Sequence, residues 1–185
     1  MAEVAETKPA IVFIGFMAAG KSEAARAAAA RLGEDLHDAD ELLEAELGMP
    51  IDEFFEREGE AAFREREERL VLDLLDDGGV IALGGGAVTS QAVREALAGQ
   101  VTAWCRVDEE VAWERAQADG GRPLARDREE FARLFAERRP LYAQAARAIL
   151  PEGGLVAGAS SAGWLAAMRS APGVRMLWAR SAAAP

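Results

Sequence analysis

The sequence is poor in cysteine, histidine and lysine. Its 185 residues include one cysteine, Cys105, and one histidine, and its lysines are Lys8 and Lys21. A single cysteine excludes an internal disulfide bond and a metal site built from several thiolates. This composition is typical of proteins from a reducing compartment, and we expect a cytoplasmic protein.

Long apolar runs and excess positive charge are also missing. No apolar segment approaches the roughly 20 residues that a membrane-spanning helix needs, and 32 acidic residues outnumber 21 basic ones, giving a net charge of −11. A surface of this sign repels nucleic acid and anionic lipid. The length fits one globular domain. We therefore expect a soluble single-domain protein with no nucleic-acid or membrane partner.

Short apolar runs alternate with helical patterns along the chain. The runs typical of buried strands are residues 10–14, 35–37, 80–83, 101–107 and 148–150. Helical patterns separate them at residues 22–32, 38–47, 51–57, 59–75, 108–118 and 127–138, with a short helix after Ser90 and another short helical piece at residues 140–142. This alternation predicts an α/β fold, in which helices cover both faces of a parallel sheet.

A phosphate-binding motif lies between the first predicted strand and helix. Residues 15–22, GFMAAGKS, match G-x-x-x-x-G-K-[ST]. Glycines allow backbone N–H groups to face the β-phosphate, and the helix N-terminus adds partial positive charge. Lys21 would then bridge the β- and γ-phosphates, and the Ser22 hydroxyl would ligate Mg²⁺. The flanking elements favour this P-loop over an accidental glycine turn.

Three further clusters could complete the site, although each has a plainer explanation. Asp38 and Asp40 follow the second predicted strand and could serve a metal and an alcohol, or be a helix cap with a solvated neighbour. Arg64 lies between Glu60 and Glu67 at helical spacing, which suits a carboxylate-binding guanidinium or a solvated helix face. The glycines at residues 84–86 follow a predicted strand and would let a ligand contact the backbone.

Taken in order, these motifs resemble shikimate kinase. The resemblance covers about residues 11–150 and rests on the P-loop together with Asp38-x-Asp40, Phe63-Arg64-x-x-Glu67, Gly84-Gly-Gly-Ala-Val88, Arg122-Pro-Leu124 and Arg138-x-Pro-Leu-Tyr142. It implies a three-layer P-loop NTPase fold of nucleoside-monophosphate-kinase type with a five-stranded parallel sheet, a helical substrate-binding region at about residues 38–70 and a lid at about residues 118–128. The implied reaction transfers the γ-phosphoryl group of ATP to the 3-hydroxyl of shikimate, in the pathway to chorismate and the aromatic amino acids.

The resemblance also implies roles for individual residues. Catalytic roles fall to Lys21, Asp38, Asp40 and Arg122, and Mg²⁺ would be held by Ser22 and Asp38. ATP would contact Gly15, Ala18, Ala19, Gly20, Lys21, Ser22, Glu23, Arg115 and Arg122, with Arg115 against the adenine. Shikimate would contact Asp40, Phe55, Phe63, Arg64, Gly84, Gly85, Gly86 and Arg138, with Glu67 orienting Arg64. Either phenylalanine could instead be core.

The chain departs from the family pattern at three places. Ala18 replaces the usual glycine, which costs roughly 1 kcal/mol if the position needs a positive φ and would weaken ATP binding. Ala125 replaces a common leucine after the lid arginine. Residues 1–173 are predicted to form the kinase domain, including a helix at about 162–170, and residues 174–185 an extension whose strand at 174–179 resembles the junction to a fused 3-dehydroquinate synthase.

Two other functions fit the same residues. One is a small-molecule kinase of the same fold that acts on another acceptor, such as gluconate. The other is a catalytically silent nucleotide-binding module, which the Ala18 substitution keeps open. For the shikimate kinase hypothesis we expect ATP and shikimate as ligands, Mg²⁺ as cofactor, and a monomer that is free or associated with 3-dehydroquinate synthase.

Overall fold

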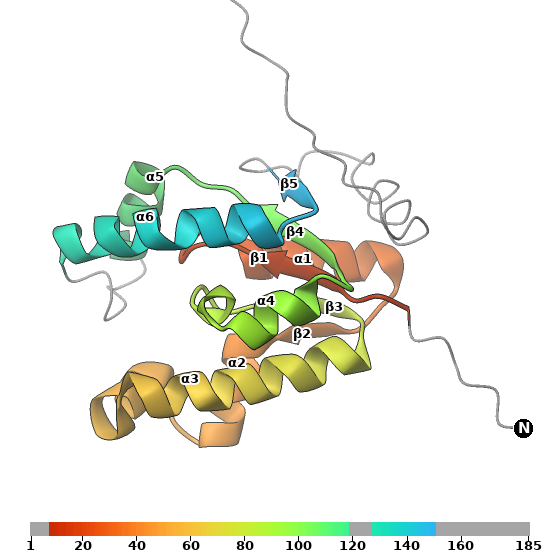
Figure 1. Cartoon of the computed structure of the whole chain (residues 1–185), viewed down its shortest axis with the longest axis horizontal. Coiled ribbons are helices and arrows are strands. Elements are labelled where there is room, and N and C mark those ends of the chain that lie inside the picture. Colours follow the sequence, from red (N-terminus) through yellow and green to blue (C-terminus); the bar gives the residue numbers. More distant parts are fainter. Residues whose placement is uncertain (1–7, 119–126, 151–185) are drawn as a thin grey trace, which may run out of the picture.

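Five short strands form one parallel sheet in the computed structural model, which describes residues 8–118 and 127–150 (Figure 1). The order across the sheet is β2-β3-β1-β4-β5. The strands are β1 (Ile11–Ile14), β2 (Leu36–Asp38), β3 (Val80–Ala82), β4 (Val101–Cys105) and β5 (Ala148–Leu150). The α/β fold with a five-stranded parallel sheet is therefore confirmed.

Strand β1 occupies the centre because every residue in it is apolar and buried. Its residue Phe13 pairs in register with Ala82 of β3 on one side and with Ala103 of β4 on the other. Strands buried on both faces are continuous apolar runs without polar alternation, as β1 and β3 are here. Strand β4 is also fully buried, and its polar residue, Thr102, donates its hydroxyl to the carbonyl oxygen of Leu97. The loop after β1 consequently leaves the middle of the sheet.

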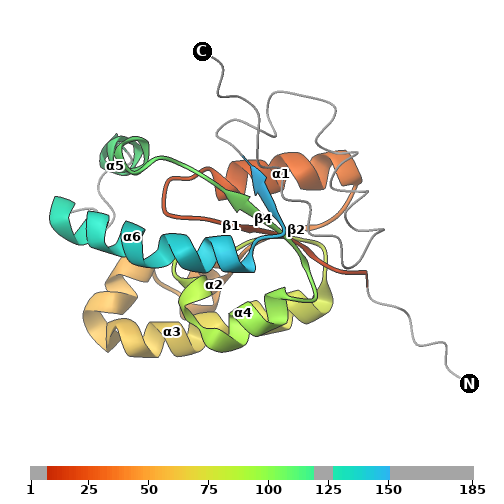
Figure 2. The same cartoon turned by 45° about the horizontal axis from the view of Figure 1, so that its top comes forward.

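The two faces of the sheet are packed with residues of different size. On one face, Ile11 and Phe13 contact small alanines of α1 (Lys21–Leu32). On the other, Val12 and Ile14 pack with larger side chains from α3 (Ile51–Asp77), α4 (Gln91–Leu97), α5 (Glu109–Ala118) and α6 (Arg128–Ala145). Figure 2 shows α1 on one side of the sheet, with α3, α4 and α6 on the other. These are the three layers expected for the fold.

Side chains and glycines set the helix ends that position the site. Asp38 accepts hydrogen bonds from the first turn of α2 (Ala39–Leu47), and Ser90 and Asp127 do the same for α4 and α6. Gly33 ends α1 in the left-handed conformation, and its backbone N–H donates to the carbonyl oxygen of Ala29. Gly59, at φ 83° and ψ 168°, interrupts α3 where two separate helices were predicted.

The structure also differs from the predicted elements at α6, at β4 and at residues 87–89. Helix α6 continues through Pro140 to Ala145, so the break predicted after Arg138 is wrong. Proline removes one backbone donor, but Arg138 and Tyr142 lie one turn apart and are both buried, which keeps the helix against the sheet. Strand β4 ends at Cys105, two residues early, and a 3-10 turn, η1 (Ala87–Thr89), was not predicted.

Several predictions fall outside the described residues. They concern most of the lid, including Arg122 and Ala125, and the helix and strand expected after residue 160. The proposed division into residues 1–173 and 174–185 thus stays a prediction. In the part of the chain that is described, no helix is long and apolar enough to cross a membrane.

Candidate active site

Three loops that carry predicted site residues leave the same edge of the sheet. The P-loop follows β1, Asp38 ends β2, and the glycines at residues 84–86 follow β3. Strands β2, β3 and β1 are neighbours and run parallel, so their carboxyl ends lie side by side. This edge is where open α/β sheets bind ligands.

The P-loop is built mainly from backbone. A Cβ atom at Gly15 would lie 2.6 Å from the carbonyl oxygen of Cys105, so the position cannot carry a side chain without movement of the loop. The Nζ atom of Lys21 donates a hydrogen bond to the carbonyl oxygen of Phe16 at 3.0 Å, across the loop. Lys21 is buried, and its charge therefore lies against the loop that would receive phosphate.

Ala18, which stands where the family pattern has glycine, adopts a conformation that is unfavourable for alanine. Its φ is 57°, in the left-handed region, and it is the one non-glycine residue with positive φ among those described. A Cβ atom disfavours this region by roughly 1 kcal/mol or slightly more. The condition stated for the cost of Ala18 is therefore met, because position 18 has a positive φ.

Ser22 and Asp38 bring the first helix and the second strand together. The Ser22 hydroxyl donates to Oδ2 of Asp38 at 2.5 Å, while Oδ1 accepts from the backbone N–H groups of Asp40 and Glu41 at 3.1 and 3.5 Å. One oxygen of Asp38 therefore caps α2, as the capping interpretation predicted, and the other faces the P-loop, while the metal role stays a prediction. A hydroxyl and a carboxylate oxygen are hard ligands that fit Mg²⁺, which takes its other ligands from phosphate and water.

The described residues do not surround this pair with a larger cluster of metal-binding side chains. Across residues 8–118 and 127–150, no group of three or more His, Cys, Asp or Glu side chains could hold a metal ion. The donor set therefore fits a cation that arrives with a phosphate ligand better than one held by protein alone.

The turn at residues 84–86 is surrounded by charged side chains. A Cβ atom at Gly84 would lie 2.6 Å from Oε1 of Glu67 and 2.7 Å from Oδ1 of Asp40, and one at Gly86 would lie 2.1 Å from Nη1 of Arg64. These glycines were expected to leave room for a ligand. In the structure, the side chains of Asp40, Arg64 and Glu67 lie in the space that a Cβ atom at Gly84 or Gly86 would need.

The middle glycine brings this turn against the P-loop. A Cβ atom at Gly85 would lie 3.3 Å from the backbone nitrogen of Met17 and 3.6 Å from the carbonyl oxygen of Gly15. The charged side chains beside Gly84 and Gly86 thus lie next to the phosphate-binding loop. A phosphoryl group bound by the P-loop could therefore reach an acceptor molecule bound by these charged side chains.

Arg64 is held by two carboxylates of unequal burial. Its Nη1 donates to Oε2 of Glu67 at 2.5 Å, and its Nε and Nη2 donate to Oε1 of Glu60 at 3.3 and 3.2 Å. Burial raises the pKa of Glu67, and the attraction of Arg64 offsets this only in part. Burial would lower the pKa of Arg64, but the ion pair with Glu67 raises it overall. The contact between Arg64 and Glu67 is consistent with the predicted role of Glu67 in orienting Arg64, and that role stays a prediction.

Arg138 is a second guanidinium, and its surroundings differ from those of Arg64. It is 5% exposed, and no described Asp or Glu forms an ion pair with it. Burial lowers the pKa of Arg138, and the repulsion of Arg64 adds to that effect. Two guanidinium groups that repel one another in a buried region form a site that an anion would stabilise.

Phe55 and Phe63 lie beneath Arg64. Their ring centroids are 4.6 Å apart, and the guanidinium carbon lies 5.9 and 5.2 Å from the two centroids. Phe63 is also part of a buried cluster with Leu43 and Phe54. Phe63 is thus core as well as a neighbour of Arg64, and contact of either ring with a substrate stays a prediction.

We call the group formed by Asp40, Arg64, Glu67, Arg138 and the turn at residues 84–86 the acceptor cluster.

Two other residues predicted to contact ATP are exposed in the structure. Glu23 is exposed in the first turn of α1, and Arg115 is exposed in the last turn of α5. Arg122 lies outside the described residues. The ATP contacts assigned to these three residues stay predictions.

Sequence reasoning missed the hydrogen bonds that fix the glycine turn. The Tyr142 hydroxyl donates to the carbonyl oxygen of Gly85 at 2.5 Å, and the Thr89 hydroxyl donates to that of Gly86 at 2.7 Å. Arg94 donates to the carbonyl oxygens of Val88 and Thr89 at 2.7 and 2.8 Å. The bond of Tyr142 spans 57 residues, so no local pattern could reveal it.

Comparison with known proteins gives a consistent result. The family model for shikimate kinase matches residues 17–167. The shikimate kinase of Paramagnetospirillum magneticum is 43% identical over 140 residues, which are 73% of this chain and 72% of that protein. That of Ruegeria pomeroyi is 38% identical over 148 residues, or 77% and 76%. A solved structure, shikimate kinase from Acinetobacter baumannii in complex with shikimate, has a TM-score of 0.73 and 29% identity and covers 88% of this chain and 92% of that one. This chain belongs to the shikimate kinase family.

Proposed function

We propose that this protein transfers the γ-phosphoryl group of ATP to the 3-hydroxyl of shikimate, forming shikimate 3-phosphate and ADP. Membership of the family supports the reaction. The observation that carries the choice of acceptor is the pair of guanidinium groups, Arg64 and the buried Arg138, beside the P-loop. Shikimate is a carboxylate with neighbouring hydroxyls, and a carboxylate is the anion that such a pair binds well.

The P-loop would bind and orient the phosphates. Its backbone N–H groups and the N-terminus of α1 would face the β-phosphate. Lys21, now bonded to the carbonyl oxygen of Phe16, would exchange that partner for phosphate oxygens. Arg122 would add positive charge as the phosphoryl group is transferred, and Arg115 would lie against the adenine. Fixed positive charge of this kind lowers the barrier to phosphoryl transfer.

Ser22 and Asp38 would hold Mg²⁺, Ser22 directly and Asp38 directly or through water. When bound, Mg²⁺ would neutralise charge on the phosphate oxygens. The 2.5 Å hydrogen bond between Ser22 and Asp38 supports this, because the two oxygens already face the same space. The interaction also ties the start of α1 to the end of β2.

The acceptor cluster would orient shikimate. Arg64 and Arg138 would bind the carboxylate, and Asp40 would accept a hydrogen bond from the reacting hydroxyl and take its proton as the bond to phosphorus forms. The nearness of Asp40 to Gly84 and of Gly85 to the P-loop supports this placement. Holding both substrates in line supplies much of the catalysis in such reactions.

A coupled assay of ADP release tests the proposal. We expect release that depends on shikimate, and neither gluconate nor nucleoside monophosphates to replace it. The same ADP release with and without shikimate would contradict the proposal. Calorimetry that showed ATP binding but no shikimate binding would favour a silent nucleotide-binding module, and activity with gluconate would favour the rival kinase.

The variant Arg64→Ala tests the acceptor site itself. Removing one guanidinium of the pair is expected to raise the shikimate KM on the order of a hundredfold, with ATP binding retained. Arg57→Ala is the matched control, because Arg57 lies on the same helix α3 in an exposed ion pair with Glu53. A shikimate KM that rises equally in both variants would contradict the carboxylate role.

We also propose a cytoplasmic monomer with residues 1–173 as the kinase domain and a lid at about residues 118–128. The family match, which ends at residue 167, is in keeping with that boundary. The relatives described above carry the name shikimate kinase alone. Fusion or association with 3-dehydroquinate synthase through residues 174–185 therefore stays a prediction without support from them.

A further inference from the structure

Tyr142 makes a polar contact that its packing does not require. The residue lies on α6, is 2% exposed, and stacks on Trp104 with ring centroids 6.1 Å apart. Phenylalanine would make the same apolar contacts. Burying a hydroxyl group is unfavourable unless it is hydrogen-bonded. A tyrosine at this buried position therefore depends on the hydrogen bond that its hydroxyl makes.

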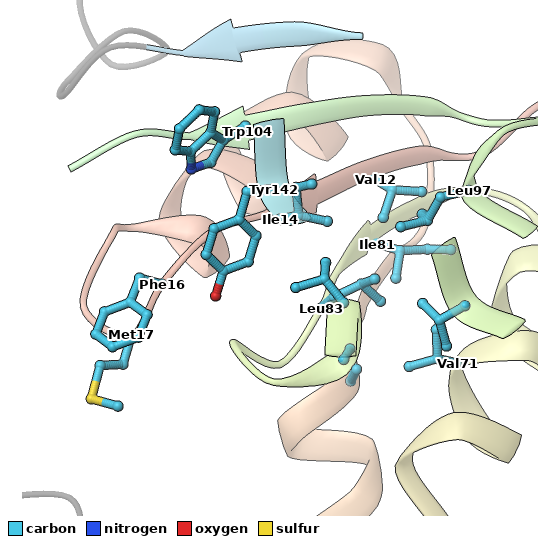
Figure 3. Close-up of a cluster of buried hydrophobic side chains, with 14 of the residues drawn as sticks. Val12, Ile14, Phe16, Met17, Val71, Ile81, Leu83, Leu97, Trp104 and Tyr142 are labelled. Atoms are coloured by element: carbon cyan, nitrogen blue, oxygen red, sulfur yellow. The ribbon is translucent and has the colours of Figure 1, made fainter. Parts of the chain in front are cut away.

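The hydroxyl group reaches the centre of the acceptor cluster. It donates to the carbonyl oxygen of Gly85 at 2.5 Å. Figure 3 shows the Tyr142 oxygen pointing away from Trp104, toward the chain that follows Leu83. Gly85 is the residue whose Cα faces the P-loop backbone at Met17. The hydrogen bond therefore fixes the turn at the point where it meets the phosphate loop.

The same oxygen lies beside the guanidinium of Arg138, which is one helical turn earlier on α6. The two side chains are electrostatic neighbours, and each alters the pKa of the other. A phenol has one proton, which Tyr142 gives to Gly85, so toward Arg138 the oxygen can act as an acceptor only. Burial raises the pKa of Tyr142, which keeps the phenol protonated and able to donate at neutral pH.

We infer that Tyr142 is a positioning residue, whose hydroxyl holds the Gly85 carbonyl and the Arg138 guanidinium in one arrangement so that Arg138 meets the substrate carboxylate. The inference rests on the proposed function. It joins helix α6 to the loop after β3 through a single oxygen atom. Arg138 has no ion-pair partner in the described structure that could hold it instead.

The variant Tyr142→Phe removes this oxygen and keeps the ring. We expect the shikimate KM to rise about tenfold, with kcat and the ATP KM changing by less than about twofold. Thr102→Val is the matched control, because it also deletes a buried hydroxyl that donates to a backbone carbonyl, that of Leu97, and lies outside the acceptor cluster. Thermal unfolding should report a similar loss of stability in both variants, whereas the change in shikimate KM should occur in Tyr142→Phe alone.

A double-mutant cycle tests the route through Arg138. In the background of Arg138→Gln there is no guanidinium to position, so adding Tyr142→Phe should raise the shikimate KM by less than about twofold. Calorimetry with shikimate alone provides a second measurement that does not depend on turnover. If the fold-increase in shikimate KM of the double variant equals the product of the fold-increases of the two single variants, the role assigned to Tyr142 is wrong.

The remaining outcomes separate this inference from the proposed function. If the wild-type protein releases ADP with shikimate but Tyr142→Phe leaves the shikimate KM unchanged, the positioning role is wrong and the function stands. If both Tyr142→Phe and Thr102→Val raise the shikimate KM equally, the hydroxyl is structural only. If the wild-type protein shows no dependence on shikimate, the proposed function is wrong and the role of Tyr142 falls with it.

Discussion

The P-loop and the acceptor cluster lie side by side but are built in different ways. The P-loop is one continuous segment, with Lys21 as its buried cation and its shape set by backbone. The acceptor cluster takes charged side chains from α2, α3 and α6 around a glycine turn. A phosphate is bound by N–H groups that any sequence supplies, whereas a carboxylate with hydroxyls needs particular side chains at fixed positions. We therefore expect the two regions to respond differently to substitution.

The largest effect should follow removal of the Lys21 charge. Lys21→Met is expected to lower kcat on the order of a hundred- to a thousandfold, since no other described cation lies on the P-loop to stabilise the transferring phosphoryl group. Steady-state ADP release measures this, and calorimetry should show shikimate binding unchanged. Lys8→Met, at an exposed lysine, is the control. Loss of shikimate binding in Lys21→Met would show that the two regions are not independent.

The next largest effect should come from a methyl group in the acceptor cluster. A Cβ atom at Gly86 would overlap the Arg64 guanidinium at 2.1 to 2.5 Å, and the flexible end of Arg64 can move aside. Gly86 has an ordinary backbone conformation, φ −95° and ψ −17°. Gly86→Ala should therefore fold but raise the shikimate KM on the order of tens of fold, with the ATP KM retained.

Gly99→Ala is the matched control for this glycine. A Cβ atom there would lie 3.7 Å from the carbonyl oxygen of Ala96, an ordinary contact. The two variants add the same methyl group to the same domain. Equal shikimate KM values in Gly86→Ala and Gly99→Ala would contradict the placement of Arg64 in the substrate site.

A smaller effect should separate the two carboxylates that hold Arg64. Glu67→Gln is expected to raise the shikimate KM about tenfold, because a buried charge-assisted hydrogen bond is lost. Glu60→Gln removes an ion pair whose carboxylate is 60% exposed, and exposed pairs contribute little. Kinetics of both variants measure the difference. A larger effect from Glu60→Gln would show that Glu67 does not orient Arg64.

The pH dependence of stability gives an independent test of Glu67. Its pKa is raised above the ordinary value of 4.5, chiefly by burial. In the window above 4.5 the unfolded chain has released this proton while the folded chain still binds it, so the contribution of Glu67 to the free energy of unfolding falls as pH rises. Above the raised pKa the contribution is constant. Urea unfolding across pH should show this slope in the wild type and not in Glu67→Gln.

The difference in construction also explains what the sequence could predict. The P-loop, the strand and helix alternation and the caps at Asp38 and Ser90 are local patterns, and the structure confirms them. The continuation of α6 through Pro140 depends on burial of Arg138 and Tyr142 against the rest of the fold. No local rule includes that burial, and the proline pattern alone predicted a break.

The acceptor cluster was predictable in its members but not in its contacts. The spacing of Glu60, Arg64 and Glu67 placed them on one helix face, because residues three and four apart are neighbours on a helix, and in the structure they form ion pairs. The approach of Asp40 and Glu67 to Gly84 depends on how α2 and α3 pack beside β3. Such contacts join distant segments, and spacing carries no information about them.

The smallest predicted effect concerns Ala18, where the P-loop does depend on a side chain. Ala18→Gly relieves a left-handed conformation and should raise the free energy of unfolding by roughly 1 kcal/mol. Ala19→Gly is the control, because Ala19 has no positive φ and glycine there adds only freedom to the unfolded chain, which should lower stability by roughly 0.5 kcal/mol. Urea unfolding measures the free energy of unfolding of both variants.

Ala18→Gly should also lower the ATP KM and leave the shikimate KM unchanged, since the strained residue lies in the phosphate loop. A parallel fall in the shikimate KM would mean that strain at Ala18 reaches the acceptor cluster, through the contact of Gly85 with the P-loop backbone.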